Sequence, residues 1–204
     1  MLLDYLKDED HPKHSYILSD KKVFYFRIPK LAGTTITVHG AHWRSADESD
    51  WINIITEDEF KKYFKFLFVR NPYDRIISLW NNFINRKREG IKIPKCTFRE
   101  FLEKDYIKQN KHIIFHSIPQ YKYVEYKGKR MDEINFIGRF EYFKRDWKII
   151  ADKFDLMEVL PVKNRNKHRH YSTYYDDWCV DKVTEMYKKD IELFNYKFER
   201  ADDK

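Results

Sequence analysis

Cysteine, glycine and proline are scarce in this chain: its 204 residues include 2 cysteines, 5 glycines and 6 prolines. Cys96 and Cys179 lie far apart, without a CxxC pair or a cysteine–histidine ligand spacing, so the sequence predicts neither a metal site nor a disulfide framework. We expect two reduced, partly buried thiols. The glycines and prolines are scattered singly and no repeat is visible, so nothing indicates a linker between domains.

Long apolar runs are absent as well. No stretch of about 18 apolar residues occurs, which excludes an obvious transmembrane segment. The N-terminal "MLLDYLKDEDHPKH" passes from two leucines directly into charged residues and lacks the apolar core of a signal peptide. We therefore expect a soluble, cytoplasmic protein.

What the chain does contain is aromatic, apolar and charged residues in amounts typical of a folded protein. Hydrophobic residues make up 42% and aromatic residues 18%, which argues against disorder despite 36% charged residues. A chain of this length fits one domain with a substantial core, so we expect a single domain over residues 1–204.

The charge balance is positive. Lysine and arginine outnumber aspartate and glutamate by 40 to 33, giving a formal charge of +7. This excess favours anionic ligands such as nucleotides, sulfated or phosphorylated compounds, or nucleic acid. An equally open interpretation is that the extra lysines only keep the protein in solution.

The order of the predicted elements indicates an α/β fold. "VFYFRI" (23–28) and "FKFLFVR" (64–70) are short apolar runs typical of buried parallel strands. Between them, Thr56 stands three residues before Glu59, the spacing of a capping box that starts a helix. After the second run, Pro72 suits the first position of a helix.

The helix after Pro72 carries an apolar stripe, with Ile76, Leu79, Trp80 and Phe83 spaced at helical intervals and Ser78 on another face. Strands that alternate with helices predict a central, mainly parallel sheet flanked by helices. Further helices are expected over 97–106, 141–154 and 176–194, two strands around "KGK", and a loop over 160–171.

The turn "PKLAGTT" (29–35) follows the first predicted strand and has the features of an anion site. Gly33 lets the backbone approach a ligand, neighbouring N–H groups form a cradle, and Lys30 adds a positive charge. The alternative is a turn whose small residues serve packing alone. The candidate anion-binding residues are Lys30, Ala32, Gly33, Thr34 and Thr35.

This turn is not a nucleoside-triphosphate loop. The pattern GxxxxGK[ST] is absent, and no paired acidic motif for magnesium follows the second strand. ATP and GTP are therefore disfavoured.

A second candidate anion site follows the second strand. Arg70 offers a forked cation, and Ser78, two helical turns on, offers a hydroxyl. The alternative is an arginine that caps the sheet and an idle surface serine. Because ligands of parallel sheets bind beyond the carboxyl ends of the strands, we expect both sites to face one crevice and to bind a ligand with two separated phosphates.

These motifs carry a family resemblance. "IPKLAGTT" followed by "FKFLFVRNPYDRIISLW" resembles the two cofactor signatures of sulfotransferases related to the carbohydrate and heparan-type enzymes, the family 2-like sulfotransferases. Those enzymes use 3'-phosphoadenosine 5'-phosphosulfate (PAPS). Later segments, including "HSIPQ" and "FIGRFEYFKRDW", are similar in kind and order, so the resemblance covers a core of about residues 23–198.

The resemblance implies roles for individual residues. Lys30 with the turn through Thr35 would bind the 5'-phosphosulfate, Arg70 and Ser78 the 3'-phosphate, and Arg165 a further phosphate oxygen. It also implies a P-loop-like three-layer fold, no metal, and transfer of a sulfuryl group to a hydroxyl or amine of an acceptor, with a carbohydrate favoured. Lys30 would in addition stabilise the charge that grows on the departing phosphate.

A general base must remove the proton of the acceptor, and His116 in "HSIPQ" is the first candidate, because histidine titrates near neutrality and the segment resembles the family's His-x-x-Pro-Gln. His39 and His42 are rivals, and a carboxylate stays open. Gln120 would orient the substrate or lie at the surface.

Other function classes remain as alternatives. The basic stretch 163–170 and the many aromatics would suit a nucleic-acid-binding module, although no RNP-like or zinc-finger motif is present. A P-loop phosphotransferase or kinase is disfavoured by the missing GK[ST]. The acceptor class stays open: it could be a saccharide, a lipid-linked sugar, a peptide tyrosine or a small metabolite. Acceptor pockets are built from loops such as 40–56 and 86–120, whose sequences do not indicate one acceptor.

Overall fold

The computed structural model describes residues 2–7, 15–39, 43–46, 55–85, 93–158 and 169–201. The chain forms two compact units: Met1–Val69 with Gln120–Lys163, and Arg70–Pro119 with Asn164–Lys204. Each unit is built from two separate segments of the chain. One domain over the whole chain stays a prediction.

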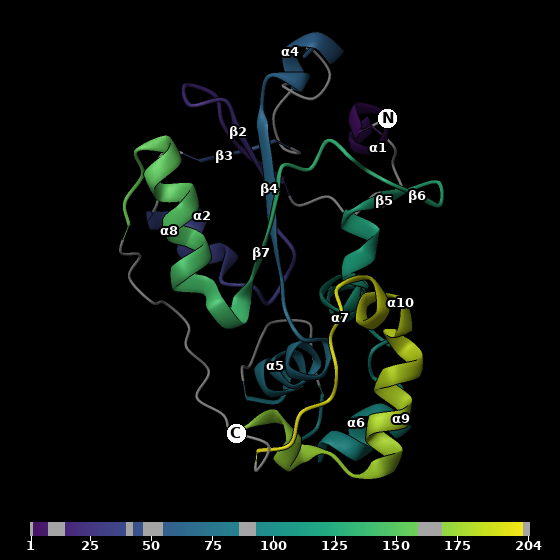
Figure 1. Ribbon diagram of the computed structural model, residues 1–204. Helices are drawn as coiled ribbons and strands as arrows, with labels where there is room; N and C mark the ends of the chain where they lie inside the picture. Colours follow the sequence, from purple (N-terminus) through teal and green to yellow (C-terminus); the bar gives the residue numbers. More distant parts are fainter. Residues whose placement is uncertain are drawn as a thin grey trace. The chain divides into compact units, whose positions relative to one another are not determined.

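The first unit contains a five-stranded sheet in the order β3-β1-β2-β4-β7 (Figure 1). Strands β2, β4 and β7 run parallel, whereas β1 is antiparallel to both of its neighbours. The bounds are β1 Ser15–Leu18, β2 Val23–Phe26, β3 Arg44–Ser45, β4 Phe64–Val69 and β7 Phe136–Arg139.

The α/β class is confirmed, but the sheet is mixed where the sequence predicted a mainly parallel one. A turn of four residues joins β1 to β2, and so short a connection allows only antiparallel pairing. Both predicted buried strands, β2 and β4, are present and pair in parallel. The P-loop-like three-layer arrangement stays a prediction.

Aromatic side chains cover both faces of the sheet. Phe68 packs against Phe143 at the start of α8 (Phe143–Phe154), with 5.1 Å between ring centroids. On the opposite face, Phe24 meets Phe60 of α4 (Glu57–Lys61) at 5.3 Å. Because side chains alternate along a strand, the two faces of β2 and β4 are buried by different helices.

The short helix α4 begins as predicted. The Thr56 hydroxyl accepts from the Glu59 N–H at 3.3 Å, and the Glu59 carboxylate accepts from the Thr56 N–H at 3.2 Å. This reciprocal pair satisfies two N–H groups that a helix start leaves open. The chain is thereby led into β4.

Two further predictions for the first unit, the strands around "KGK" and a helix over 141–154, agree with the structure. The "KGK" turn joins β5 to β6, with Lys127 and Gly128 at φ 48° and 76°. In α8, Trp147 and Ile150 are fully buried. The remaining elements are α1 Leu2–Lys7, α2 Gly33–His39, η1 Gln120–Tyr123, β5 Glu125–Tyr126, β6 Lys129–Arg130 and η2 Phe140–Tyr142.

The described part of the second unit is helical. Its helix α5 begins at Pro72 as predicted, and the stripe from Ile76 to Phe83 is buried. Ser78 is also buried, so α5 is covered on more than one face. The elements are α5 Pro72–Asn85, α6 Phe98–Glu103, α7 Lys111–Ser117, η3 Tyr171–Tyr174, α9 Asp177–Met186 and α10 Lys188–Leu193.

The single final helix expected over 176–194 is wrong: two helices occupy this segment. Tyr187 lies between them at φ −120° and ψ 22°, outside the helical range. There its hydroxyl donates to the Ser117 carbonyl at 2.9 Å, a bond to a residue 70 positions away that no local pattern reveals.

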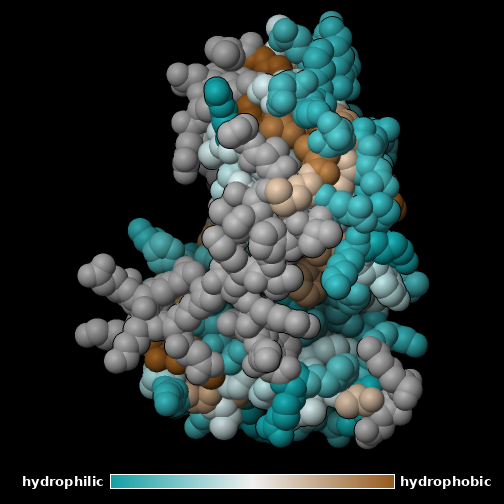
Figure 2. Space-filling model, turned by 90° about the vertical axis from the view of Figure 1, so that its left-hand side faces the viewer, coloured by the Kyte–Doolittle hydropathy of each residue, from teal (hydrophilic) through white to brown (hydrophobic). Residues whose placement is uncertain are grey.

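The surface and the cysteines complete the description. Figure 2 shows hydrophilic residues surrounding smaller hydrophobic areas on the side that carries α8. Cys96 is half-buried and Cys179 is buried, and both are free. No helix among the described residues has the length and apolar character needed to cross a bilayer, and a cytoplasmic location stays a prediction.

Candidate functional site

The turn after β2 has an unusual backbone. Lys30 has φ 73° and Ala32 has φ 57°, both in the left-handed region. This conformation costs a residue other than glycine about 1 kcal/mol or more, and it persists where the surroundings impose it, as at ligand sites. The predicted anion turn is therefore a sharply bent segment that leads into α2.

Part of the predicted N–H cradle is engaged within the turn. The Thr35 N–H donates to the Ala32 carbonyl at 2.8 Å, and the Ile36 N–H donates to the same oxygen at 3.2 Å. The Thr35 side chain is buried. Thr35 thus stabilises the bend, whereas Thr34, which is half-buried, stands at the start of α2.

Arg27, which sequence reasoning missed, lies over this turn. Its guanidinium donates to the Thr34 hydroxyl at 3.1 Å and to the Tyr16 hydroxyl at 2.9 Å. It also lies 5.5 Å from the centre of the Tyr16 ring. Arg27 therefore holds one of the predicted anion-binding side chains and brings a second positive charge to the turn.

Gly33 makes room for Arg27. A Cβ atom at Gly33 would lie 2.6 Å from Cγ and 2.8 Å from Cδ of Arg27, well inside van der Waals contact. Gly33 is the first residue of α2 and has no left-handed backbone, so alanine would fit the backbone itself. Glycine is therefore needed at position 33 because the Arg27 side chain lies against it.

Replacing Gly33 by alanine is expected to lower the activity that depends on this turn about 10-fold while leaving the melting temperature nearly unchanged, because Arg27 must leave Thr34. Initial rates and thermal melts of G33A, R27A and the double variant measure this. The losses should not add, since both variants remove the same contact. Additive losses would contradict the role assigned to Gly33.

Aromatic side chains pack around Tyr25, which lies close to Arg27. Tyr25 stands opposite Tyr16 on β1, stacks on Phe66 at 4.8 Å and lies 6.1 Å from the ring of Trp43. Burial raises the pKa of Tyr25 well above its usual value, although the nearby Arg27 acts in the opposite direction. The phenol therefore stays neutral beside Arg27.

The second predicted site lies in the second unit, where Arg70 is 6% exposed. Its Nη2 and Nε atoms contact the same oxygen, Oδ2 of Asp74, at 2.8 and 2.9 Å. Asp74 stands in the first turn of α5, where a carboxylate is favoured. The sequence predicted a cation open to a phosphate, whereas the structure shows that cation paired with a carboxylate.

Ser78 belongs to the same part of α5. It is 7% exposed and lies four residues after Asp74, so both side chains project from one face of the helix. The structure therefore places Arg70, Asp74 and Ser78 together, and Ser78 is buried, unlike the surface serine of the alternative interpretation. Asp74 is the member of this group that sequence reasoning did not assign to the site.

His116 lies in the last turn of α7. Its Nδ1 atom is 2.7 Å from the His112 carbonyl, and because a carbonyl only accepts, Nδ1 carries the hydrogen. In the neutral ring, Nε2 is then an acceptor. The half-buried imidazole lies edge-on to Phe83 and Phe115, at 5.7 and 5.4 Å between centroids. This tautomer is the one that a base acting through Nε2 requires.

Several residues predicted for the site lie in parts of the chain that the structure does not describe. Arg165 and His42 lie outside the described residues, and so does the side chain of His39. Gln120 is fully buried in η1, so it is not a surface residue. No group of three or more potential metal ligands occurs among the described residues, and metal independence stays a prediction.

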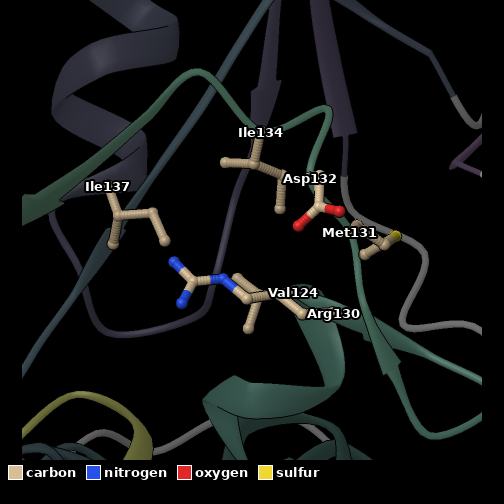
Figure 3. Close-up of a pocket in the computed structure, with 6 residues that line it drawn as sticks. All are labelled: Val124, Arg130, Met131, Asp132, Ile134 and Ile137. Carbon is tan, nitrogen blue, oxygen red and sulfur yellow. The ribbon is translucent and has the colours of Figure 1, made fainter.

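A pocket of about 200 Å³ lies elsewhere in the first unit, beside β7 and the β5–β6 hairpin. Figure 3 shows the Arg130 guanidinium reaching from the hairpin toward Ile137, with the Asp132 carboxylate on the other side of Ile134. None of the predicted site residues lines this pocket, so it is distinct from the anion turn. Its lining residues are Val124, Arg130, Met131, Asp132, Ile134 and Ile137.

Comparison with known proteins identifies the family. A model of the sulfotransferase family, family 2, matches residues 13–197. The chain belongs to the sulfotransferase family. It is a sulfotransferase, and the predicted resemblance is confirmed. The match includes the bent turn after β2, Arg70 with Ser78, and His116. No curated protein and no solved structure matches the chain.

Proposed function

We propose that this sulfotransferase uses PAPS as its donor and transfers the sulfuryl group to a hydroxyl of a carbohydrate acceptor. One observation carries the proposal: β2, β4 and β7 run parallel, and each leads into or ends at an arginine. Arg27 follows β2, Arg70 follows β4, and Arg139 ends β7. Carboxyl ends of neighbouring parallel strands share one edge, so the chain places cations repeatedly where anionic ligands of such sheets bind.

The bent turn after β2 is proposed to hold the 5'-phosphosulfate. Lys30 supplies an ammonium, and the Thr34 hydroxyl accepts a hydrogen bond from Arg27 at 3.1 Å. Ala32, Gly33 and Thr35 shape the bend. Membership of the family supports the assignment, since its donor is typically PAPS.

Arg70 and Ser78 are proposed to hold the 3'-phosphate. A phosphate carries more negative charge than the Asp74 carboxylate and matches the forked geometry of a guanidinium. Binding would then turn Arg70 from Asp74 toward the phosphate. Until the nucleotide arrives, the ion pair with Asp74 holds Arg70. Arg165 is proposed as a further phosphate contact.

The chemistry follows from these roles. The acceptor oxygen forms a bond to sulfur while the bond between sulfur and the bridging phosphate oxygen breaks. His116 takes the acceptor's proton on Nε2, the atom left unprotonated by the bond between Nδ1 and the His112 carbonyl. Lys30 donates to the bridging oxygen and stabilises the charge that the nucleotide carries away. These residues supply acid–base and electrostatic catalysis without a metal.

Calorimetry with 3'-phosphoadenosine 5'-phosphate, set against 5'-AMP, tests the donor. The bisphosphate should bind at least about 10-fold more tightly, because only it reaches both anion sites. Equal affinities would contradict the proposal. A screen with sulfate-labelled donor then tests the acceptor. Label should enter oligosaccharides, and label confined to tyrosine peptides or small phenols would overturn the carbohydrate assignment.

A further inference from the structure

Buried side chains from other elements hold the carbonyl groups at the end of α7. The Nη2 atom of Arg75 donates to the His116 carbonyl at 3.1 Å and to the Ile118 carbonyl at 2.8 Å. The Tyr187 hydroxyl donates to the Ser117 carbonyl between them, at 2.9 Å. Three consecutive carbonyls are thus bound by two side chains that come from α5 and from the α9–α10 junction.

A helix as short as α7 needs such contacts. It has seven residues, and a helix of this length is marginal on its own. The last carbonyls of a helix receive no hydrogen bond from an N–H group of the same helix, and a positive charge near the C-terminus of a helix is favourable. Arg75 supplies that charge. The Asn110 side chain caps the other end by accepting from the His112 N–H at 2.9 Å.

Arg75 and Tyr187 together form a clamp on the backbone at the end of α7, and both donors are buried and stay protonated. Arg75 is 3% and Tyr187 is 4% exposed, so water cannot readily replace either donor if it is removed. Burial raises the pKa of Tyr187 to about 12, so the phenol retains the proton that it donates.

The position of α7 also sets the position of the imidazole. The ring of His116 is tied to its own helix through the His112 carbonyl, so it moves with the end of α7. Phe83, on α5 like Arg75, lies edge-on to the ring. Helix α5 packs against α7 (Figure 1) and so contacts both the backbone and the ring of His116.

We propose that Arg75 and Tyr187 are positioning residues for this sulfotransferase, which fix His116 as an acceptor at Nε2 by clamping the backbone of residues 116–118. The inference rests on the proposed role of His116 as the base. Neither residue touches the reacting atoms. Both act through the end of α7.

The variants Y187F and R75K test the clamp. Phenylalanine keeps the ring and loses the hydroxyl, and lysine keeps the charge but loses the planar guanidinium whose Nη2 atom donates to both carbonyls. In ¹⁵N-histidine NMR spectra, the fraction of His116 with hydrogen on Nδ1 should fall in both variants. Exchange of the Ser117 and Ile118 amide hydrogens should speed up about 10-fold, and kcat should fall about 10-fold while the KM for PAPS stays unchanged.

Tyr171 offers a matched control. Its buried hydroxyl accepts from the Glu199 N–H at 2.8 Å, away from α7. Y171F loses one buried phenol bond in the same unit and should change neither the His116 tautomer nor exchange at 117–118. If Y187F folds and leaves both unchanged, the clamp is refuted.

A wrong assignment of His116 as the base would give other results than a refuted clamp. H116Q should lower kcat about 100-fold. If H116Q stays active, His116 is not the base. The NMR and exchange data on Y187F would still decide whether the clamp orders the imidazole.

Discussion

Replacement of Lys30 by alanine is expected to lower kcat/KM about 1000-fold, the largest effect predicted for this protein. The ammonium is the proposed donor of the bent turn, and the loss of a donor to a developing oxyanion typically costs two to three orders of magnitude, or about 3–4 kcal/mol. Initial rates with sulfate-labelled PAPS measure the effect. K144A, which removes an exposed lysine of α8, should behave as the wild type.

Replacing Lys30 by glycine separates the contribution of the ammonium group from that of the backbone conformation. Lys30 has φ 73°, a conformation that glycine adopts without strain. K30G should therefore be as stable as the wild type or about 1 kcal/mol more stable, yet as inactive as K30A. Thermal melts and rates on the same samples show both effects. An active K30G would mean that the turn contributes its shape and that the ammonium has no part in catalysis.

Replacement of Arg70 by alanine should weaken binding of 3'-phosphoadenosine 5'-phosphate at least about 100-fold and lower turnover by a similar factor. A charged, forked donor to phosphate is removed, and such bonds are among the strongest that side chains make. Titration calorimetry measures the affinity. Binding of 5'-AMP, which lacks the 3'-phosphate, should change little.

Asp74 supplies the controls for Arg70. In R70A the Asp74 carboxylate loses its partner, so the R70A/D74A double variant removes the unpaired charge as well. Its stability should recover while binding stays weak. D74N should bind the bisphosphate as well as the wild type or better, because Arg70 no longer has to leave a carboxylate. If R70A binds normally, Arg70 only caps the sheet.

Local signals in the sequence were sufficient for most elements. The apolar runs at 23–28 and 64–70 became β2 and β4, and Thr56 with Glu59 formed the predicted capping box. Pro72 begins α5. These features depend on residues within a few positions of one another, and their physics is the same in any fold.

The candidate site was only partly predictable for the same reason. The turn 29–35 was recognisable from its residues, but the bond between Arg27 and Tyr16 joins residues 11 positions apart, one directly after β2 and one on β1. The Arg70–Asp74 pair was within reach of the sequence, since four residues separate the two on a helix. The sequence interpretation assigned only phosphate-binding residues to this site and did not include Asp74.

Residue order alone indicated an α/β protein and predicted anion sites in two turns after buried strands, because strand and helix patterns and turn chemistry are local properties. Long-range packing decided the rest: which strand pairs run antiparallel, that Gly33 accommodates Arg27, and that Arg75 and Tyr187 meet the end of α7. Arg75 and Tyr187 contact residues 41 to 70 positions away along the chain, so no short window of sequence contains these bonds. Arg27 and Gly33 are close in sequence, but their contact depends on how the turn after β2 bends back in the folded chain.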